Sequence, residues 1–165
     1  MEKTKPIKRS AAIVEFSRDH HFALLLLWKI REGLKNSIEP SRIGSYVIHF
    51  FDQDLIPHFQ AEEEILFSRL PKENALRLQA EEEHRNIYRI MDAMKKNPAE
   101  PAALDQFTEA LESHIRFEER ELFNYLQDNI SEAELSEIAS WLKARTHDPG
   151  VAWSDTFWDN KRPKK

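Results

Sequence analysis

The chain has 165 residues, a formal net charge of −5, 41% hydrophobic and 32% charged residues, 3 glycines and no cysteine. This length suits one domain, and the lack of cysteine excludes disulfides, thiolate metal sites and thiol nucleophiles. The acidic balance disfavours a general nucleic-acid binder, and the low glycine content favours an all-α protein.

No segment has the pattern of a membrane span or of a secretion signal. The longest apolar run, residues 22–28, is much shorter than the roughly 20 residues that a membrane-spanning helix needs. The charged residues 1–9 are not followed by the apolar core of a signal peptide. We therefore expect a cytoplasmic protein that contacts no membrane.

Apolar residues at helical spacing predict two long helices in the first half of the chain. Residues 1–10 are polar and predicted to be loose, and a first helix then ends near Lys35. A second helix begins at Pro40, because proline suits the first turn, and ends before Pro71. Pro57 lies within its apolar period, and since the stripe keeps its phase there, we predict a kink, with a loop as the alternative.

The second half predicts a matching pair of helices and a short fifth one. The third helix covers residues 73–96, the turn 97–101 holds two prolines, and the fourth helix continues to about Asn129. Ser131 with Glu134 forms a capping box that opens the fifth helix, which ends near Arg145. The predicted fold is an all-α, antiparallel up-down four-helix bundle over residues 11–145.

Residues 146–165 are predicted to be an irregular aromatic tail that packs on the bundle. Its aromatic residues are Trp153, Phe157 and Trp158. Large aromatic side chains usually find a partner surface. A contact between two copies of the chain, or a cover over the functional site, are the alternatives for these residues.

Each of the four long helices carries one histidine at a position where its apolar stripe calls for an aliphatic residue. These histidines are His20, His58, His84 and His114, and two of them precede a glutamate by four residues, Glu62 and Glu118. Residues four apart share one helix face. Buried carboxylates beside imidazoles are costly without a positive charge among them, so the pattern predicts a metal site in the core.

The number of residues between each histidine and the connecting turns indicates that the four histidines lie in one common layer of the bundle. Successive histidines lie roughly 18 and 20, then 14 and 12, then 15 and 15 residues from the turn between them, so the mismatch in height is within about 3 Å. His21 competes with His20 but lies about 100° round the helix from it, so we prefer His20. His49 is expected to be a surface or tail contact, and His147 has no predicted partner.

Runs of glutamate beside these histidines are predicted to be solvated helix faces. They comprise Glu63, Glu64, Glu81, Glu82 and Glu83. Glu81 lies one turn before the histidine of its helix and is a candidate for a further ligand.

The motifs RDHH, HFQAE, EEEH and HIRFE, in this order, resemble the hemerythrin-like (HHE cation-binding) domain family over about residues 15–128. The resemblance implies a four-helix bundle with a non-haem di-iron centre. It also implies that Glu62 and Glu118 bridge the two metals and that the four histidines are terminal ligands. Nitrogen and oxygen donors suit two iron ions, with manganese or zinc as other candidates.

The chain departs from the oxygen carriers of that family at two places. Where they have a second histidine on the third helix, this chain has Tyr88, a candidate ligand or a donor to bound oxygen, or else a core tyrosine that hydrogen-bonds locally. They also use an aspartate five residues after the last histidine, whereas this chain has Glu118 at four and Glu119 at five. We prefer Glu118, since five residues turn a helix about 140° and four only about 40°.

The functional hypothesis is that the metal centre binds or senses dioxygen, nitric oxide or a similar small ligand, without a catalytic residue of its own. A redox enzyme or iron-handling protein, acting in nitric oxide or peroxide reduction or in ferrous oxidation and storage, is one alternative. A metal-free structural bundle is the other. We expect no nucleic-acid partner, and the sequence leaves open a homodimer or a regulatory protein partner.

Overall fold

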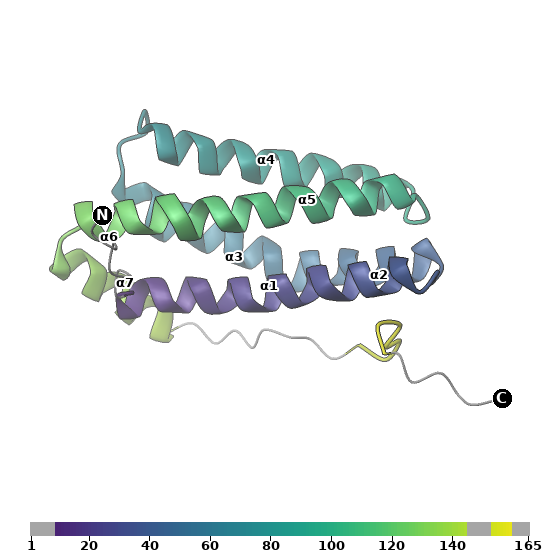
Figure 1. The fold of residues 1–165 in the computed structure, drawn as a ribbon. Coiled ribbons are helices and arrows are strands. Elements are labelled where there is room, and N and C mark those ends of the chain that lie inside the picture. Colours follow the sequence, from purple (N-terminus) through teal and green to yellow (C-terminus); the bar gives the residue numbers. More distant parts are fainter. Residues whose placement is uncertain (1–8, 145–152, 160–165) are drawn as a thin grey trace, which may run out of the picture.

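The computed structural model describes residues 9–144 and 153–159, and all regular elements among them are helices (Figure 1). The all-helical prediction is thereby confirmed. None of these helices is long and apolar enough to span a membrane. Most of the predicted loose N-terminus, His147 and the predicted tail apart from residues 153–159 lie outside the described residues.

Helix α1 covers Ala11–Lys35, close to the prediction. The side chain of Ser10 caps it by accepting a hydrogen bond from the backbone N–H of Ile13 at 3.3 Å. Ser37 has a φ of 58° and turns the chain towards the next helix.

The second helical stretch continues without a break from Pro40 to Arg69. It consists of α2 (Pro40–Phe50), the π-helical η1 (Phe51–Leu55), α3 (Ile56–Ala61), the π-helical η2 (Glu62–Leu66) and the 3-10 turn η3 (Phe67–Arg69). Pro57 lies within helix, so the loop alternative is wrong. Because proline cannot donate a backbone hydrogen bond and its ring crowds the preceding turn, the wider π-helical turn before it accommodates the ring.

The remaining helices follow the predicted order. They are α4 (Ala75–Lys96), α5 (Pro101–Phe117), the π-helical η4 (Glu118–Leu122), α6 (Phe123–Asn129) and α7 (Glu132–Ala144). The side chain of Asn74 caps α4 through the N–H groups of Leu76 and Arg77, each at 3.0 Å. The predicted Ser131 cap is present, since its Oγ accepts a hydrogen bond from the N–H of Glu134 at 3.1 Å.

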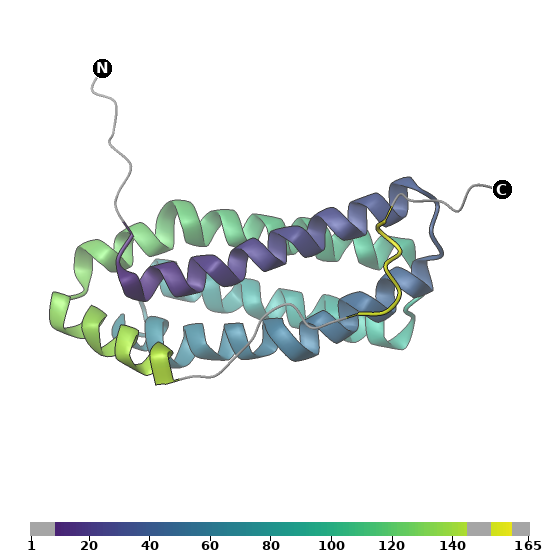
Figure 2. The same cartoon turned by 90° about the horizontal axis from the view of Figure 1, so that it is seen from below.

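The long helices lie side by side, and the apolar core between them is divided into two clusters (Figures 1 and 2). One cluster includes Ile30, Val47, Met91 and Phe107, and the other includes Ile13, Leu66, Ala80 and Phe123. On every long helix, a buried histidine lies at or near the boundary between the two clusters, and Glu62 and Glu118 lie there too on the second and fourth stretches. The fold therefore surrounds one polar layer with apolar packing on both sides.

The described part of the C-terminal tail, residues 153–159, packs on α1 and α2. Phe157 is 4% exposed, and its ring lies 5.8 Å from that of Tyr46. The Lys29 ammonium stands 4.0 Å from the centroid of the Trp158 ring, a cation–π contact.

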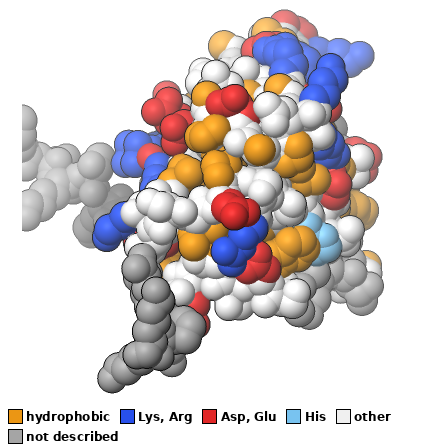
Figure 3. All heavy atoms as spheres, turned by 90° about the vertical axis from the view of Figure 1, so that its right-hand side faces the viewer, with side chains coloured by type: hydrophobic (Ala, Val, Ile, Leu, Met, Phe, Trp, Pro, Cys, Tyr) orange, Lys and Arg blue, Asp and Glu red, His pale blue; other side chains and the backbone are white. Residues whose placement is uncertain are grey.

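Figure 3 shows the end of the bundle where the α1–α2 and α4–α5 turns lie, with small hydrophobic patches scattered among charged side chains. At this end α2 approaches the α4–α5 turn closely at Gly44. A Cβ added there would lie 2.5 Å from the carbonyl oxygen of Pro98. Glycine is therefore required by a backbone contact, although it lies within a helix.

We expect Gly44→Ala to destabilise the protein by about 1–3 kcal/mol, because the new methyl group overpacks a backbone contact. In a helix free of such contacts, the same change would stabilise by up to about 1 kcal/mol. Urea unfolding measures the difference, with the exposed neighbour Ser45→Ala as the control. An equal or higher stability of Gly44→Ala would show that this contact does not constrain the turn.

Candidate metal centre

The six residues of the predicted ligand set are all buried and lie together in the polar layer. They are His20 on α1, His58 on α3, Glu62 on η2, His84 on α4, His114 on α5 and Glu118 on η4. Both glutamates are fully inaccessible to solvent. Ionisable groups at this depth are rare unless they are paired or bind a metal.

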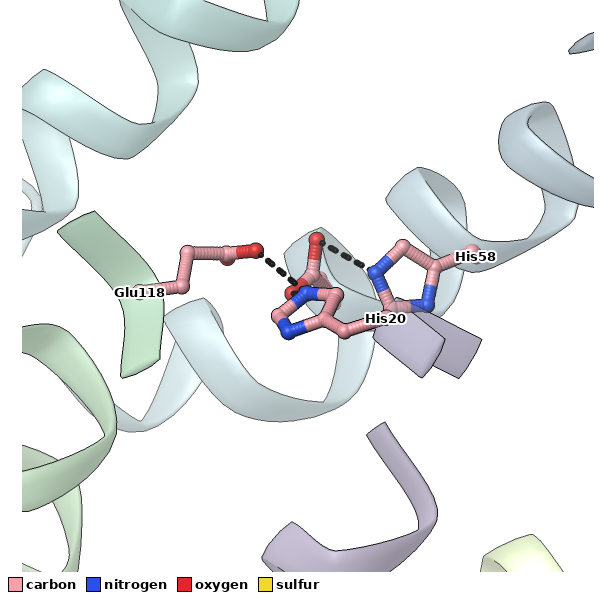
Figure 4. Close-up of side chains that lie close together, drawn as sticks. His20, His58 and Glu118 are labelled. Atoms are coloured by element: carbon pink, nitrogen blue, oxygen red, sulfur yellow. Dashed lines mark hydrogen bonds and ion pairs between the residues drawn. The ribbon is translucent and has the colours of Figure 1, made fainter. Parts of the chain in front are cut away.

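Their donor atoms form two groups that share both carboxylates. One group is His20, His58, Glu62 and Glu118, and the other is Glu62, His84, His114 and Glu118. Within each group the donor atoms lie within 4.8 Å of one another. Figure 4 shows His20, His58 and Glu118 converging on one point from different helices. The geometry thus offers two adjacent cation positions with Glu62 and Glu118 between them.

The Nε2 atoms of the four rings face the two carboxylates. Glu118 Oε1 lies 3.0 Å from Nε2 of His20 and 3.1 Å from Nε2 of His114. Glu62 Oε1 lies 3.3 Å from Nε2 of His58 and 3.2 Å from Nε2 of His84. Each carboxylate therefore contacts one histidine from each donor group.

The other ring nitrogen, Nδ1, points outward to a second carboxylate in every case. The pairs are His20 with Glu119 at 2.9 Å, His58 with Asp19 at 2.9 Å, His114 with Glu83 at 2.7 Å and His84 with Glu63 at 3.7 Å. Each of these carboxylates belongs to a residue that is adjacent in sequence to one of the six donor residues. It contacts the histidine of the next long helix along the chain. The last one, Glu119, contacts His20 on α1 and so closes the circle. We call this arrangement the carboxylate ring.

The carboxylate ring determines which ring nitrogen of each histidine faces the centre. In the three shorter pairs the Nδ1–H donates to a carboxylate, so a ring that loses its second proton directs its Nε2 lone pair at the centre, the arrangement that metal-bound histidines commonly show. The prediction that Glu83 belongs to a solvated face is wrong, because Glu83 reaches His114 on the neighbouring helix at 2.7 Å. Glu63 remains 38% exposed and lies farther from its histidine, at 3.7 Å. An acidic residue beside a ligand on every helix was the available signal.

Burial and the neighbouring ionisable groups shift the pKa values of the donor residues. Burial, with the nearby charge of Glu118, raises the pKa of Glu62 to about 8. Burial also disfavours charge on Glu118 and His114, but their mutual attraction outweighs it. The pKa of Glu118 is held well below its usual value, and that of His114 rises to about 10. Without a cation, the centre retains protons.

The donor set fits metal ions. His58 Nε2, Glu62 Oε2 and Glu118 Oε2 are buried, and they have no hydrogen-bond partner among the described residues. Leaving such atoms unpaired is costly, whereas a cation would satisfy them. Two imidazole nitrogens and two carboxylates per group, without sulfur, suit iron or manganese and leave coordination positions open.

A small cavity of about 10 Å³ lies beside the centre. Three histidines of the donor groups, His20, His58 and His114, form one part of its wall. The rest is mainly apolar, with two acidic residues: Phe22, Ala23, Phe50, Leu55, Phe59, Leu111, Ile115, Asp19 and Asp54. A volume of this size holds about one water molecule, so only a ligand of very few atoms fits.

Three other candidates lie outside the donor groups. His21 is exposed on α1. His49 contacts the tail, with its ring centroid 4.9 Å from that of Trp153. Glu81 forms an ion pair with Arg77 at 3.5 Å.

Tyr88 lies one turn after His84 and is partly buried. Its ring packs against the rings of Phe51 and Phe59, at centroid distances of 5.4 and 6.0 Å. Phe59 in turn stacks on His84 at 4.1 Å. Tyr88 thus lies beside an aromatic residue, Phe59, that stacks on a histidine of the donor groups.

The fold and the centre define a helical bundle with a buried histidine and glutamate cluster that could hold a metal ion. A family model described as the hemerythrin HHE cation binding domain matches residues 12–126, a range that contains all six donor residues. The chain belongs to this family. Comparison with curated proteins and with solved structures gave no significant match.

We expect Asp19→Asn to lower metal affinity by about 10–100-fold, because the amide is a weaker partner for His58 Nδ1–H than the carboxylate. Competition with a chromophoric chelator measures the affinity. Asp52→Asn is the control, since Asp52 pairs only with the exposed Lys95 in the described structure. Equal affinities in the two variants would show that Asp19 does not orient His58.

We also expect cation binding to release about two protons per chain near neutral pH, because bound metal displaces protons from its ligands. Glu62 and His114, with pKa values of about 8 and about 10, are protonated under these conditions. Affinity should therefore rise as the pH is raised from about 6 to about 8. Calorimetric titration with manganese(II) in buffers of different ionisation enthalpy counts the protons. Heats that do not depend on the buffer would contradict this expectation.

Proposed function

We propose that the protein is a non-haem di-iron protein, an antiparallel four-helix bundle whose centre binds or senses dioxygen or another diatomic ligand such as nitric oxide. The observation that carries the proposal is the sharing of Glu62 and Glu118 by both donor groups. A carboxylate between two cations offsets their mutual repulsion, and this favours a pair of ions over a single one.

In this proposal the four histidines are terminal ligands, two for each ion, and the carboxylate ring holds their orientation. Each ion then has four protein donor groups, fewer than the six that octahedral coordination needs. When bound, such an iron pair supplies open coordination positions and one-electron redox chemistry. The same donor set also accepts manganese or zinc, and metal loading in the cell decides among them.

The cavity supports a small apolar ligand. Its wall includes Leu55, Leu111 and Ile115 beside His20 and His58. An apolar lining excludes bulk water from the open side of the centre, and the volume of about 10 Å³ excludes larger substrates. Diatomic molecules satisfy both restrictions.

A redox role in nitric oxide or peroxide reduction, or in ferrous oxidation and storage, is the second candidate. It is favoured by Asp54, a 6% exposed carboxylate in the mainly apolar wall of the cavity. A carboxylate at this place is a candidate to accept or deliver protons when a bound molecule is reduced. Reversible binding of dioxygen has no need of such a group.

Anaerobic loading with ferrous iron, followed by metal analysis and optical spectra before and after dioxygen or nitric oxide, tests the proposal. We expect two irons per chain and new visible absorption bands. His58→Ala and Glu118→Ala should bind less than half of this iron, because each removes a donor from a shared centre. His49→Ala is the matched control, since this histidine contacts the tail and belongs to neither donor group.

The spectra then distinguish the two roles. Bands that disappear on deoxygenation support reversible binding, whereas a single irreversible oxidation, or repeated turnover of peroxide or nitric oxide, supports the redox role. Fewer than two bound metals in the unmodified protein, or full loading of Glu118→Ala, would overturn the di-metal centre.

A further inference from the structure

The outer face of α1 carries most of the large hydrophobic side chains that the described structure exposes. Val14, Leu24, Leu25 and Trp28 are 39%, 44%, 41% and 48% exposed, and only Leu78 and Trp141 on other helices join them. In Figure 2, α1 lies nearer to the viewer than α4 and α5. The ligand His20 and the apolar core lie on the opposite side of α1. This surface therefore belongs to no part of the proposed metal centre.

The residues of this face follow a regular spacing along the whole helix. Alternating steps of four and three residues connect Val14, Arg18, His21, Leu25, Trp28, Glu32 and Lys35. Such steps keep residues on one stripe of a helix, and they are the spacing by which two helices pack along their length. The stripe is about 32 Å long at 1.5 Å per residue.

The charges on the stripe complement those of an antiparallel second copy. With a two-fold axis at Leu25, residue numbers that add up to about 50 come to the same height, so Arg18 lies beside Glu32 of the partner subunit and Glu15 beside Lys35 of the partner subunit. The apolar middle then pairs Leu25 with itself and His21 with Trp28 of the partner subunit. A parallel copy would instead place Arg18 beside Arg18 and Glu32 beside Glu32, which is repulsive.

From this self-complementarity we propose that the protein forms a two-fold symmetric homodimer through the outer face of α1, with the two α1 helices antiparallel. Among the described residues Arg18 pairs with Glu15, at 3.3 Å on an exposed surface, and such a pair is weak. Breaking this pair to form a contact across the interface therefore costs little. Burial of Leu24, Leu25 and Trp28 provides the apolar contribution to association.

Sedimentation equilibrium of the full chain tests the proposal. We expect a mass of twice 19.5 kDa. Leu25→Glu places two like charges on the two-fold axis and should weaken the dimer by at least tenfold. Leu78→Glu, at a comparably exposed leucine on α4, is the matched control and should leave the dimer intact. Circular dichroism should show unchanged helix content in both variants, since both leucines face solvent in the single chain.

A charge exchange tests the register. Arg18→Glu and Glu32→Arg should each weaken the dimer, and the double variant should restore it, because the pair is then reversed across the interface. A single-chain mass at every concentration would overturn the proposal, and so would a dimer that persists in Leu25→Glu. A double variant no better than either single variant would overturn the antiparallel register.

Discussion

The structure depends on two fully buried carboxylates, Glu62 and Glu118, at the centre of an otherwise apolar bundle. Burying both as anions without a compensating charge would cost several kcal/mol. In the chain by itself the compensation is by protons, and the pKa values of Glu62 and Glu118 move in opposite directions as a result. A pair of cations would compensate both carboxylates at once, so metal binding and the stability of the folded bundle are linked.

The surrounding residues maintain the geometry that this balance needs. Apolar clusters on both sides of the layer fix its height within the bundle, and Phe59 stacks on His84 while Phe123 stacks on His20. Both shared glutamates are the first residues of π-helical segments, η2 and η4. A π-helical turn contains an extra residue relative to an α-helical one, and such turns occur often at functional sites. The two shared glutamates are thus both positioned by a π-helical turn.

Helix positions and the six buried donors follow from the sequence because both depend on periodicity. His20 rather than His21, and Glu118 rather than Glu119, are the residues of each pair that enter the donor groups, as the angular argument favours. Periodicity says less about the contacts that side chains make with neighbouring helices. The roles of Glu63 and Glu83 depend on which helix lies beside them, and the π-helical segments depend on local hydrogen bonding that an apolar pattern does not encode. Tyr88 shows the same limit, since the packing of Phe51 and Phe59 decides its surroundings.

The carboxylate ring has a consequence for the order in which the protein is made. His58 and His114 are oriented by carboxylates of the preceding helical stretch, whereas the partner of His20, Glu119, lies 99 positions further along the chain. A ribosome releases the chain from its N-terminus, so His58 and His114 emerge after the carboxylates that orient them, while the first histidine emerges long before its own. The centre closes only when the last long helix is complete, and a nascent chain therefore offers no finished site for a metal ion until most of it has been synthesised.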